Sequence, residues 1–198
     1  LQALHRAILR GEPVRGGARP GPRPPTARLA VPAQLLAEPP GFIGRHDQIA
    51  QLDHLLEAAG RDDTALTCVL SGTAGVGKSA MALHWAHRVR DRFPDGHLYA
   101  NLRGFDPARP AMTAGEAVRV FLDAFGVPAE RVPAHPDAQT ALYRSLLDGK
   151  RILVVLDNAR DEAQVRPLLP GSPGCVVLVT SRSQLTGLVA AEGARPVP

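Results

Sequence analysis

Gly72-Thr73-Ala74-Gly75-Val76-Gly77-Lys78-Ser79 is the stretch that decides the fold of this 198-residue chain. It matches the pattern G-x-x-x-x-G-K-[ST] at every fixed position. An apolar, branched run at 66–70 precedes it, and a helical pattern from Lys78 to about Arg92 follows. A glycine-rich turn between a buried strand and a helix lets backbone amides and the positive helix end hold a phosphate. The stretch therefore predicts a phosphate-binding loop.

Each position of this loop has an expected role. The amides around Gly75 to Ser79 would hold negative charge, Lys78 would reach the β and γ oxygens, and the Ser79 hydroxyl would ligand Mg²⁺. The sequence thus predicts a nucleotide site that takes ATP or ADP with Mg²⁺ as cofactor. The nucleotide-binding residues expected from the loop are Gly72, Thr73, Ala74, Gly75, Val76, Gly77, Lys78, Ser79 and Ala80.

A second strand should bring a carboxylate to the loop. The apolar run 152–156 ends in Asp157, the position at which P-loop proteins hold Mg²⁺ through water. Ser79 and Asp157 are therefore the expected metal residues. The next residue is Asn158, where many hydrolysing relatives place a second acid, and an amide is a poor general base.

A cation follows another apolar run, at 175–179. Thr180, Ser181 and Arg182 stand just past it, and in open parallel sheets that end of a strand lines the ligand crevice. Arg182 there could sense the γ-phosphate, or it could be a solvated or structural arginine. Asp157 and Arg182 are the two expected catalytic residues.

The fold class follows from the order of elements. Strands expected at 66–70, 97–102, 152–156 and 175–179 are apolar throughout and separated by helical segments, which favours a parallel sheet covered on both faces. The class is α/β, a three-layer P-loop NTPase. Because the chain stops at Pro198, soon after the fourth strand, we expect a sheet truncated there.

The N-terminal part differs in composition. Residues 1–10 have the apolar stripe of a helix end, the eight prolines of residues 11–40 predict a disordered Pro/Gly/Arg-rich linker, and the nucleotide-binding domain is expected at 41–198. Residues 1–30 hold six arginines and one acid, so the remainder is nearly neutral although the chain carries +4. The basic tail is interpreted as a solvated linker or, alternatively, a non-specific polyanion contact.

Several classes are disfavoured. No apolar run approaches the roughly 20 residues that span a bilayer, so a cytoplasmic protein without membrane contact is expected. Cys68 and Cys175 stand in apolar runs that support neither a zinc site nor a disulfide framework. His84 and His87 lie one helical turn apart without a third ligand nearby, and are interpreted as surface or interface residues.

Four segments together resemble the NB-ARC class of STAND ATPases. They are Phe42-Ile43-Gly44-Arg45, the loop at 72–79, Leu156-Asp157-Asn158 and Val179-Thr180-Ser181-Arg182. The resemblance implies that Phe42, Ile43, Gly44 and Arg45 contact adenine and ribose and that Arg182 is a sensor. It also implies a nucleotide switch between ADP-bound and ATP-bound forms. The amide at Asn158 separately predicts slow or no hydrolysis.

Three further segments look like the AfsR/SARP-type bacterial transcriptional regulators: 101–105, 156–160 and 169–174. Residues 1–10 are similar to the end of the helical activation domain of that family. The resemblance implies partners in winged-helix, helical and TPR-like domains of the same regulator, contact with DNA only through such other parts, and self-association. Since relatives clamp ADP with subdomains not expected here, the switch in this chain would be incomplete.

Three functions stay open on the sequence. They are a nucleotide-dependent regulatory switch, a turnover P-loop ATPase such as a motor or AAA-like enzyme, and a P-loop kinase. No acceptor-site motif favours the kinase, and Asn158 disfavours a fast motor.

Overall fold

A five-stranded parallel sheet forms the centre of the computed structural model, which describes residues 30–198. Its strand order is β2-β3-β4-β1-β5, and every neighbouring pair is parallel. The three-layer α/β class is thereby confirmed. The strands are β1 (Leu66–Ser71), β2 (His97–Asn101), β3 (Leu153–Ala159), β4 (Val176–Ser181) and β5 (Arg195–Val197).

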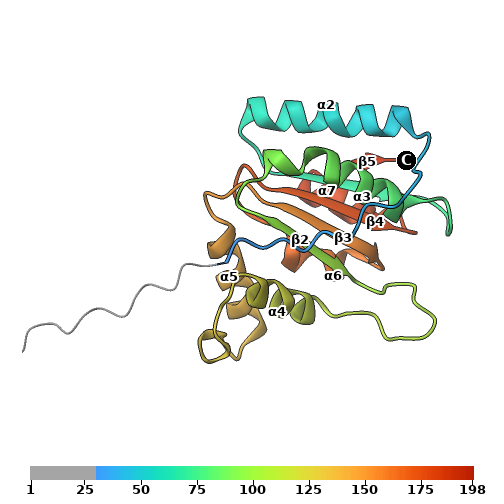
Figure 1. Cartoon of the computed structure of the whole chain (residues 1–198). Coiled ribbons are helices and arrows are strands. Elements are labelled where there is room, and N and C mark those ends of the chain that lie inside the picture. The colour runs from blue at the N-terminus through green and yellow to red at the C-terminus, as the bar shows by residue number, and fades with distance from the viewer. Residues whose placement is uncertain (1–29) are drawn as a thin grey trace, which may run out of the picture.

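Helices cover both faces of the sheet (Figure 1). α2 (His46–Asp62) and α3 (Lys78–Val89) pack on one face, and α4 (Ala114–Ala124) and α5 (Pro136–Leu147) on the other. Shorter elements are α6 (Glu162–Val165), α7 (Thr186–Glu192) and the 3₁₀ turns η1 (Arg90–Arg92), η2 (Ala129–Arg131) and η3 (Arg166–Leu168). Within residues 30–198, none of the helices has the length and apolar character needed to cross a membrane.

The two strands β3 and β4 are almost completely buried between the helical layers. β4 is buried at every residue and β3 at all but one, as expected for strands covered on both faces. On the α2–α3 face the only tryptophan of the chain, Trp85, is fully buried and donates its indole N–H to the Asp53 carboxylate at 3.0 Å. Asp53 also pairs with Arg88 at 2.9 Å. These polar contacts fix α3, the helix that follows the P-loop, against α2.

Helix ends mostly follow the sequence signals. Thr113 and Glu116 form a capping box at the start of α4, and Gly126 and Gly149 take positive φ after α4 and α5. α2, by contrast, continues past Gly60, although glycine often ends a helix. It ends at Asp62, and the next residue, Asp63, has a left-handed backbone and donates its N–H to the Ala59 carbonyl.

The expected truncation after the fourth strand is wrong. A fifth strand, β5, runs parallel to β1 and pairs Cys68 with Arg195 and Leu70 with Val197. Three residues that include Pro196 give too weak a pattern to be recognised in a sequence, and proline is tolerated here because β5 is an edge strand.

Part of the expected linker is ordered. Residues 30–38 lie along the free edge of β2 as a strap: His97 donates its N–H to the Pro32 carbonyl at 2.8 Å, and Gln34 donates to the His97 carbonyl at 2.9 Å. Residues 30–38 therefore do not form a disordered segment, because the strap pairs with β2 through Pro32 and Gln34. Pro32 uses only its carbonyl in this pairing, so its missing N–H costs nothing. The predicted helix end at 1–10 and the rest of the linker lie outside the described residues.

Candidate functional site

The P-loop joins β1 to α3, as expected from its flanking patterns. Gly75 and Gly77 have φ of 78° and 85°, a left-handed region that glycine enters without steric cost. Lys78 opens α3 and its Nζ donates to the carbonyls of Gly72 at 2.8 Å and Thr73 at 2.7 Å. The lysine ammonium is thus held over the loop that precedes it.

Asp157 on β3 lies directly beside the P-loop. Its Oδ1 accepts hydrogen bonds from the Ser79 and Thr180 hydroxyls, both at 2.6 Å, and its Oδ2 accepts one from the Tyr99 hydroxyl at 3.3 Å. Three elements therefore fix one carboxylate that is only 7% exposed. The structure brings Ser79 and Asp157 together, as the sequence predicted for these two residues.

Thr180 and Tyr99 are contacts that our sequence analysis did not assign. Thr180 follows the same apolar run that led to Arg182, so its position at a strand end was a usable signal. Tyr99 lies inside β2, and no sequence signal places it next to Asp157 because that needs the strand order. Burial, and then the nearby Asp157 carboxylate, raise the pKa of Tyr99, so its hydroxyl stays a donor.

Asn158 adopts an unusual backbone conformation at the end of β3. Its φ is +58°, in the left-handed region that asparagine tolerates better than most residues, and the β3–β4 register shifts at this point. The Asn158 N–H donates to the Thr180 hydroxyl at 2.9 Å, and its carbonyl accepts from Gly104 at 2.7 Å. Asn158 is therefore held on one side by β4 and on the other by the loop that follows β2.

These groups surround one cavity of about 370 Å³. Arg182 joins Lys78 and Asp157 in its wall, where it was expected at the carboxyl end of the strands. Asp157 is the only carboxylate among the lining residues, which are Ala74, Gly75, Gly77, Lys78, Ser79, Ala80, Asp157, Asn158, Thr180, Ser181 and Arg182.

The surroundings of the cavity lower the pKa of Lys78. Partial burial, followed by the charge of Arg182, lowers the pKa of Lys78, while Asp157 acts in the opposite direction. Two cations thus face one carboxylate, and an anionic ligand would relieve their repulsion.

The segment from Phe42 to Arg45 reaches the P-loop from outside this cavity. Arg45 donates to the Val76 carbonyl at 2.6 Å, Ile43 is 89% exposed, and the Phe42 ring stacks on His84 with centroids 4.5 Å apart. Gly44 has a φ of 87°. The segment therefore touches both the loop and α3, while its expected contact with adenine and ribose stays a prediction.

His84 and His87 contact the chain segment just before it. His84 Nδ1 lies 2.7 Å from the Glu38 carboxylate, and His87 Nε2 lies 2.7 Å from the Leu36 carbonyl. Both histidines thus form an interface between α3 and residues 36–42, in agreement with their interpretation as interface residues.

A family model described as the AAA ATPase domain matches residues 41–171 of the chain. Two curated relatives are similar over 96% of the chain. Regulatory protein AfsR of Streptomyces coelicolor (strain ATCC BAA-471 / A3(2) / M145) is 41% identical over 197 residues, and Regulatory protein AfsR of Streptomyces griseus is 44% identical over 194 residues. The chain spans 19% of the length of each of these relatives.

Solved structures share the fold at low identity. The crystal structure of Cdc6p from Pyrobaculum aerophilum has a TM-score of 0.55 and 16% identity, and covers 81% of this chain and 47% of its own. The Aeropyrum pernix ORC2 protein in ADPNP–ADP complexes has a TM-score of 0.54 and 15% identity, with 82% and 49% covered. At these identities the likeness concerns the fold alone.

Proposed function

The chain belongs to the AAA ATPase domain family, and from that premise we propose that it is the adenine-nucleotide switch module of a regulatory protein. It binds ADP or ATP with Mg²⁺ at the P-loop and hydrolyses ATP slowly or not at all. The proposal rests on one observation: Lys78, Ser79 and Asp157 line the same cavity. The residue after Asp157, Asn158, lines it too and carries an amide instead of a carboxylate.

The residues of the site fit Mg²⁺. The Ser79 hydroxyl and the Asp157 carboxylate are oxygen donors of the kind that Mg²⁺ prefers, and their oxygens lie 2.6 Å apart. Ser79 would bind the ion directly and Asp157 would hold it through water. When bound, Mg²⁺ would supply positive charge that offsets the negative charge developing on the phosphates. The Thr180 and Tyr99 hydroxyls keep the carboxylate of Asp157 turned toward Ser79.

Slow hydrolysis follows from the lack of a free base in the cavity wall. Asp157 accepts hydrogen bonds from Ser79, Thr180 and Tyr99, and its remaining acceptor site would take the water that holds Mg²⁺. Asn158 can position a water molecule but hardly accept its proton. A site built this way holds a triphosphate better than it cleaves one.

The regulatory role rests on similarity. The AfsR relatives are named regulatory proteins, and the segments at 101–105, 156–160 and 169–174 resemble AfsR/SARP-type regulators. We infer that the NB-ARC-like exchange of ADP and ATP, read through Arg182, controls contacts with other domains of such a regulator and self-association. DNA would be bound by those other domains.

The two lysines of the chain provide a matched test of binding. Lys78 faces the cavity, whereas Lys150 lies before β3, at the opposite end of the sheet. Calorimetric titration of the 198-residue chain with ATP and Mg²⁺ should show that Lys78→Ala weakens affinity on the order of 10- to 100-fold, since a charged hydrogen-bond partner of the phosphates is lost. Lys150→Ala should stay within about twofold of the native affinity.

Equal effects of the two substitutions would overturn the assignment of the cavity. If neither ATP nor ADP bound to the native chain, the proposed function would be wrong altogether.

A further inference from the structure

The loop between β2 and α4 carries an aromatic ring to the edge of the P-loop cavity. The ring is that of Phe105, and the guanidinium carbon of Arg182 lies 4.9 Å from its centroid. This distance is within the range of a cation–π contact. Phe105 stands in the 101–105 segment, to which the proposed function assigns no role.

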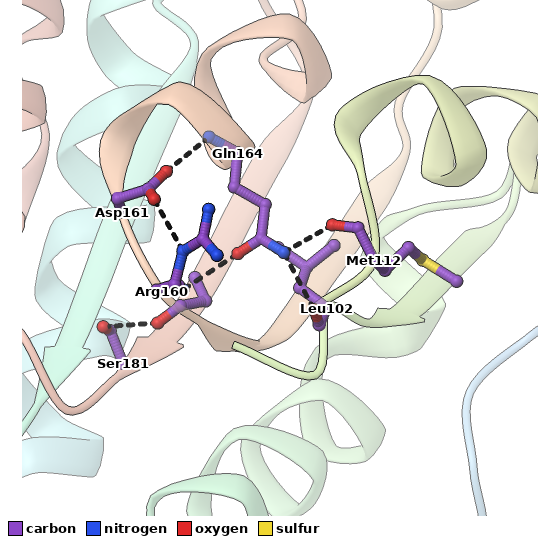
Figure 2. Close-up of polar contacts among 7 residues, drawn as sticks. Leu102, Met112, Arg160, Asp161, Gln164 and Ser181 are labelled. Carbon is purple, nitrogen blue, oxygen red and sulfur yellow. Dashed lines mark hydrogen bonds and ion pairs between the residues drawn. The ribbon is translucent and has the colours of Figure 1, made fainter. Parts of the chain in front are cut away.

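The base of this loop is closed by one buried side chain. The Gln164 side-chain amide donates to the carbonyls of Leu102 at 2.8 Å and Met112 at 2.5 Å, the two residues at which the loop leaves and rejoins the fold. Its oxygen accepts from the Arg160 N–H at 2.8 Å (Figure 2). Asp161 in turn accepts from the Gln164 backbone N–H at 3.0 Å. Gln164 therefore ties the loop to the segment that follows β3.

The start of the loop is also pressed against β3 next to the cavity. A Cβ atom on Gly104 would lie 2.4 Å from the Arg160 nitrogen and 2.6 Å from the Asn158 oxygen, so only glycine fits. The Gly104 N–H bonds to the same Asn158 carbonyl at 2.7 Å. The residue after Gly104 is Phe105. Backbone contacts with β3 thus fix the point from which the ring extends.

Arg182 needs such a fixed partner to act in the cavity. It is an exposed residue that lines the cavity wall, and a free arginine side chain loses rotamer entropy when it is immobilised. A ring that holds the guanidinium beside the cavity removes part of that cost before a ligand arrives. Since the proposed function has Arg182 read the exchange of ADP for ATP, the benefit should fall on the triphosphate.

We propose that Phe105 is a positioning residue for Arg182 and that their stack makes the site favour a nucleoside triphosphate over a diphosphate. This inference rests on the proposed function. Its structural basis is the 4.9 Å contact and the double attachment of the loop through Gln164 and Gly104.

The test is a calorimetric comparison of ATP and ADP affinities in the 198-residue chain with Mg²⁺. Phe105→Ala should lower ATP affinity about two- to fivefold, the value of an exposed cation–π contact, and leave ADP affinity unchanged. Phe105→Leu retains apolar bulk without an aromatic face and should behave like Phe105→Ala. Phe105→Tyr should restore the native ratio of ATP to ADP affinity.

A double-mutant cycle shows whether Phe105 acts through Arg182. In an Arg182→Ala background, Phe105→Ala should have no further effect on ATP affinity. An equal loss of ATP and ADP affinity, an unchanged ratio, or a higher ATP affinity in Phe105→Ala would overturn the positioning role while leaving the proposed function intact. Absence of binding to the native chain would instead refute both.

Discussion

The two lysines of this chain mark two cavities at opposite ends of one sheet. Lys78 lies in the P-loop cavity of about 370 Å³, and Lys150 lies in a groove of about 800 Å³ where β1, β3 and β4 begin. The larger groove mixes charges of both signs, and one pair within it, Arg92 and Glu57, lies 2.6 Å apart. The smaller cavity gathers polar groups around a single carboxylate, Asp157.

The volume of a cavity is a poor guide to its chemistry in this molecule. At the Lys150 end cations lie among acids, and the Arg92–Glu57 pair neutralises part of the wall. At the Lys78 end two cations, Lys78 and Arg182, line one cavity together with residues from the ends of β3 and β4, since the carboxyl ends of parallel strands meet there. Convergence of like groups therefore identifies the site better than size does.

The largest expected effect is that of a substitution at Asn158 on the rate of ATP hydrolysis. We expect native turnover below the roughly 1 to 1000 per second typical of enzymes. Asn158→Asp supplies a carboxylate in a backbone conformation that aspartate also tolerates, and should raise single-turnover hydrolysis roughly 10- to 100-fold. Rapid-quench measurement with excess protein reports this rate.

Asn158→Ala serves as the control for the same position. It should stay at the native rate or below, because it adds no base. Sustained, Lys78-dependent turnover of several per second in the unmodified chain would contradict the switch and favour a turnover ATPase.

Two glycines, one at each end of the sheet, have similar left-handed backbone conformations. Gly77 and Gly149 have φ of 85° and 68°, and a Cβ on either would meet no atom within 4 Å. Alanine at each position should lower the free energy of unfolding by about 1 kcal/mol. Only Gly77→Ala should also lower ATP affinity, on the order of tenfold, because a methyl group would intrude where the loop backbone approaches phosphate.

Denaturant unfolding and calorimetry measure the two quantities separately. Equal losses of ATP affinity in Gly77→Ala and Gly149→Ala would mean that strain spreads through the fold, and that the two ends of the sheet are not independent.

The smallest expected effect is a dependence of ATP affinity on pH. Since burial and Arg182 lower the pKa of Lys78, its ammonium begins to lose its proton below the ordinary pH range of lysine. Phosphate favours the protonated form, so ATP affinity should fall a few-fold as pH rises through that lowered pKa. Arg182→Ala removes one cause of the shift and should move the decline to higher pH.

Calorimetry in two buffers of different ionisation enthalpy would detect the accompanying proton uptake. An affinity that does not change with pH up to the ordinary pKa of lysine would contradict the role of Lys78. Lys150→Ala should leave the profile as it is in the native chain.

The P-loop and Asp157 could be predicted from the sequence because each is recognised from a short run of consecutive residues. The P-loop at 72–79 has its motif and its flanking strand and helix, and Asp157 ends an unmistakable apolar run. Their meeting also followed, since the carboxyl ends of parallel strands lie along one edge.

Contacts that depend on strand order could not be predicted in the same way. Tyr99 reaches Asp157 only because β2 pairs with β3, and Phe105 reaches Arg182 across β3 from a loop with no periodic pattern. The strap at 30–38 carries the composition of a linker, and its order comes from an unpaired sheet edge rather than from its own residues.

The burial of Trp85 makes its fluorescence a natural probe of the folded state. The only indole of the chain lies fully buried on the helix that begins with Lys78 and hydrogen-bonded to Asp53 of α2. Its emission therefore comes from a single site, which is shielded from solvent in the folded chain and becomes exposed when α2 and α3 separate. Intrinsic emission can then follow folding and nucleotide-linked movement of the P-loop helix without an added dye.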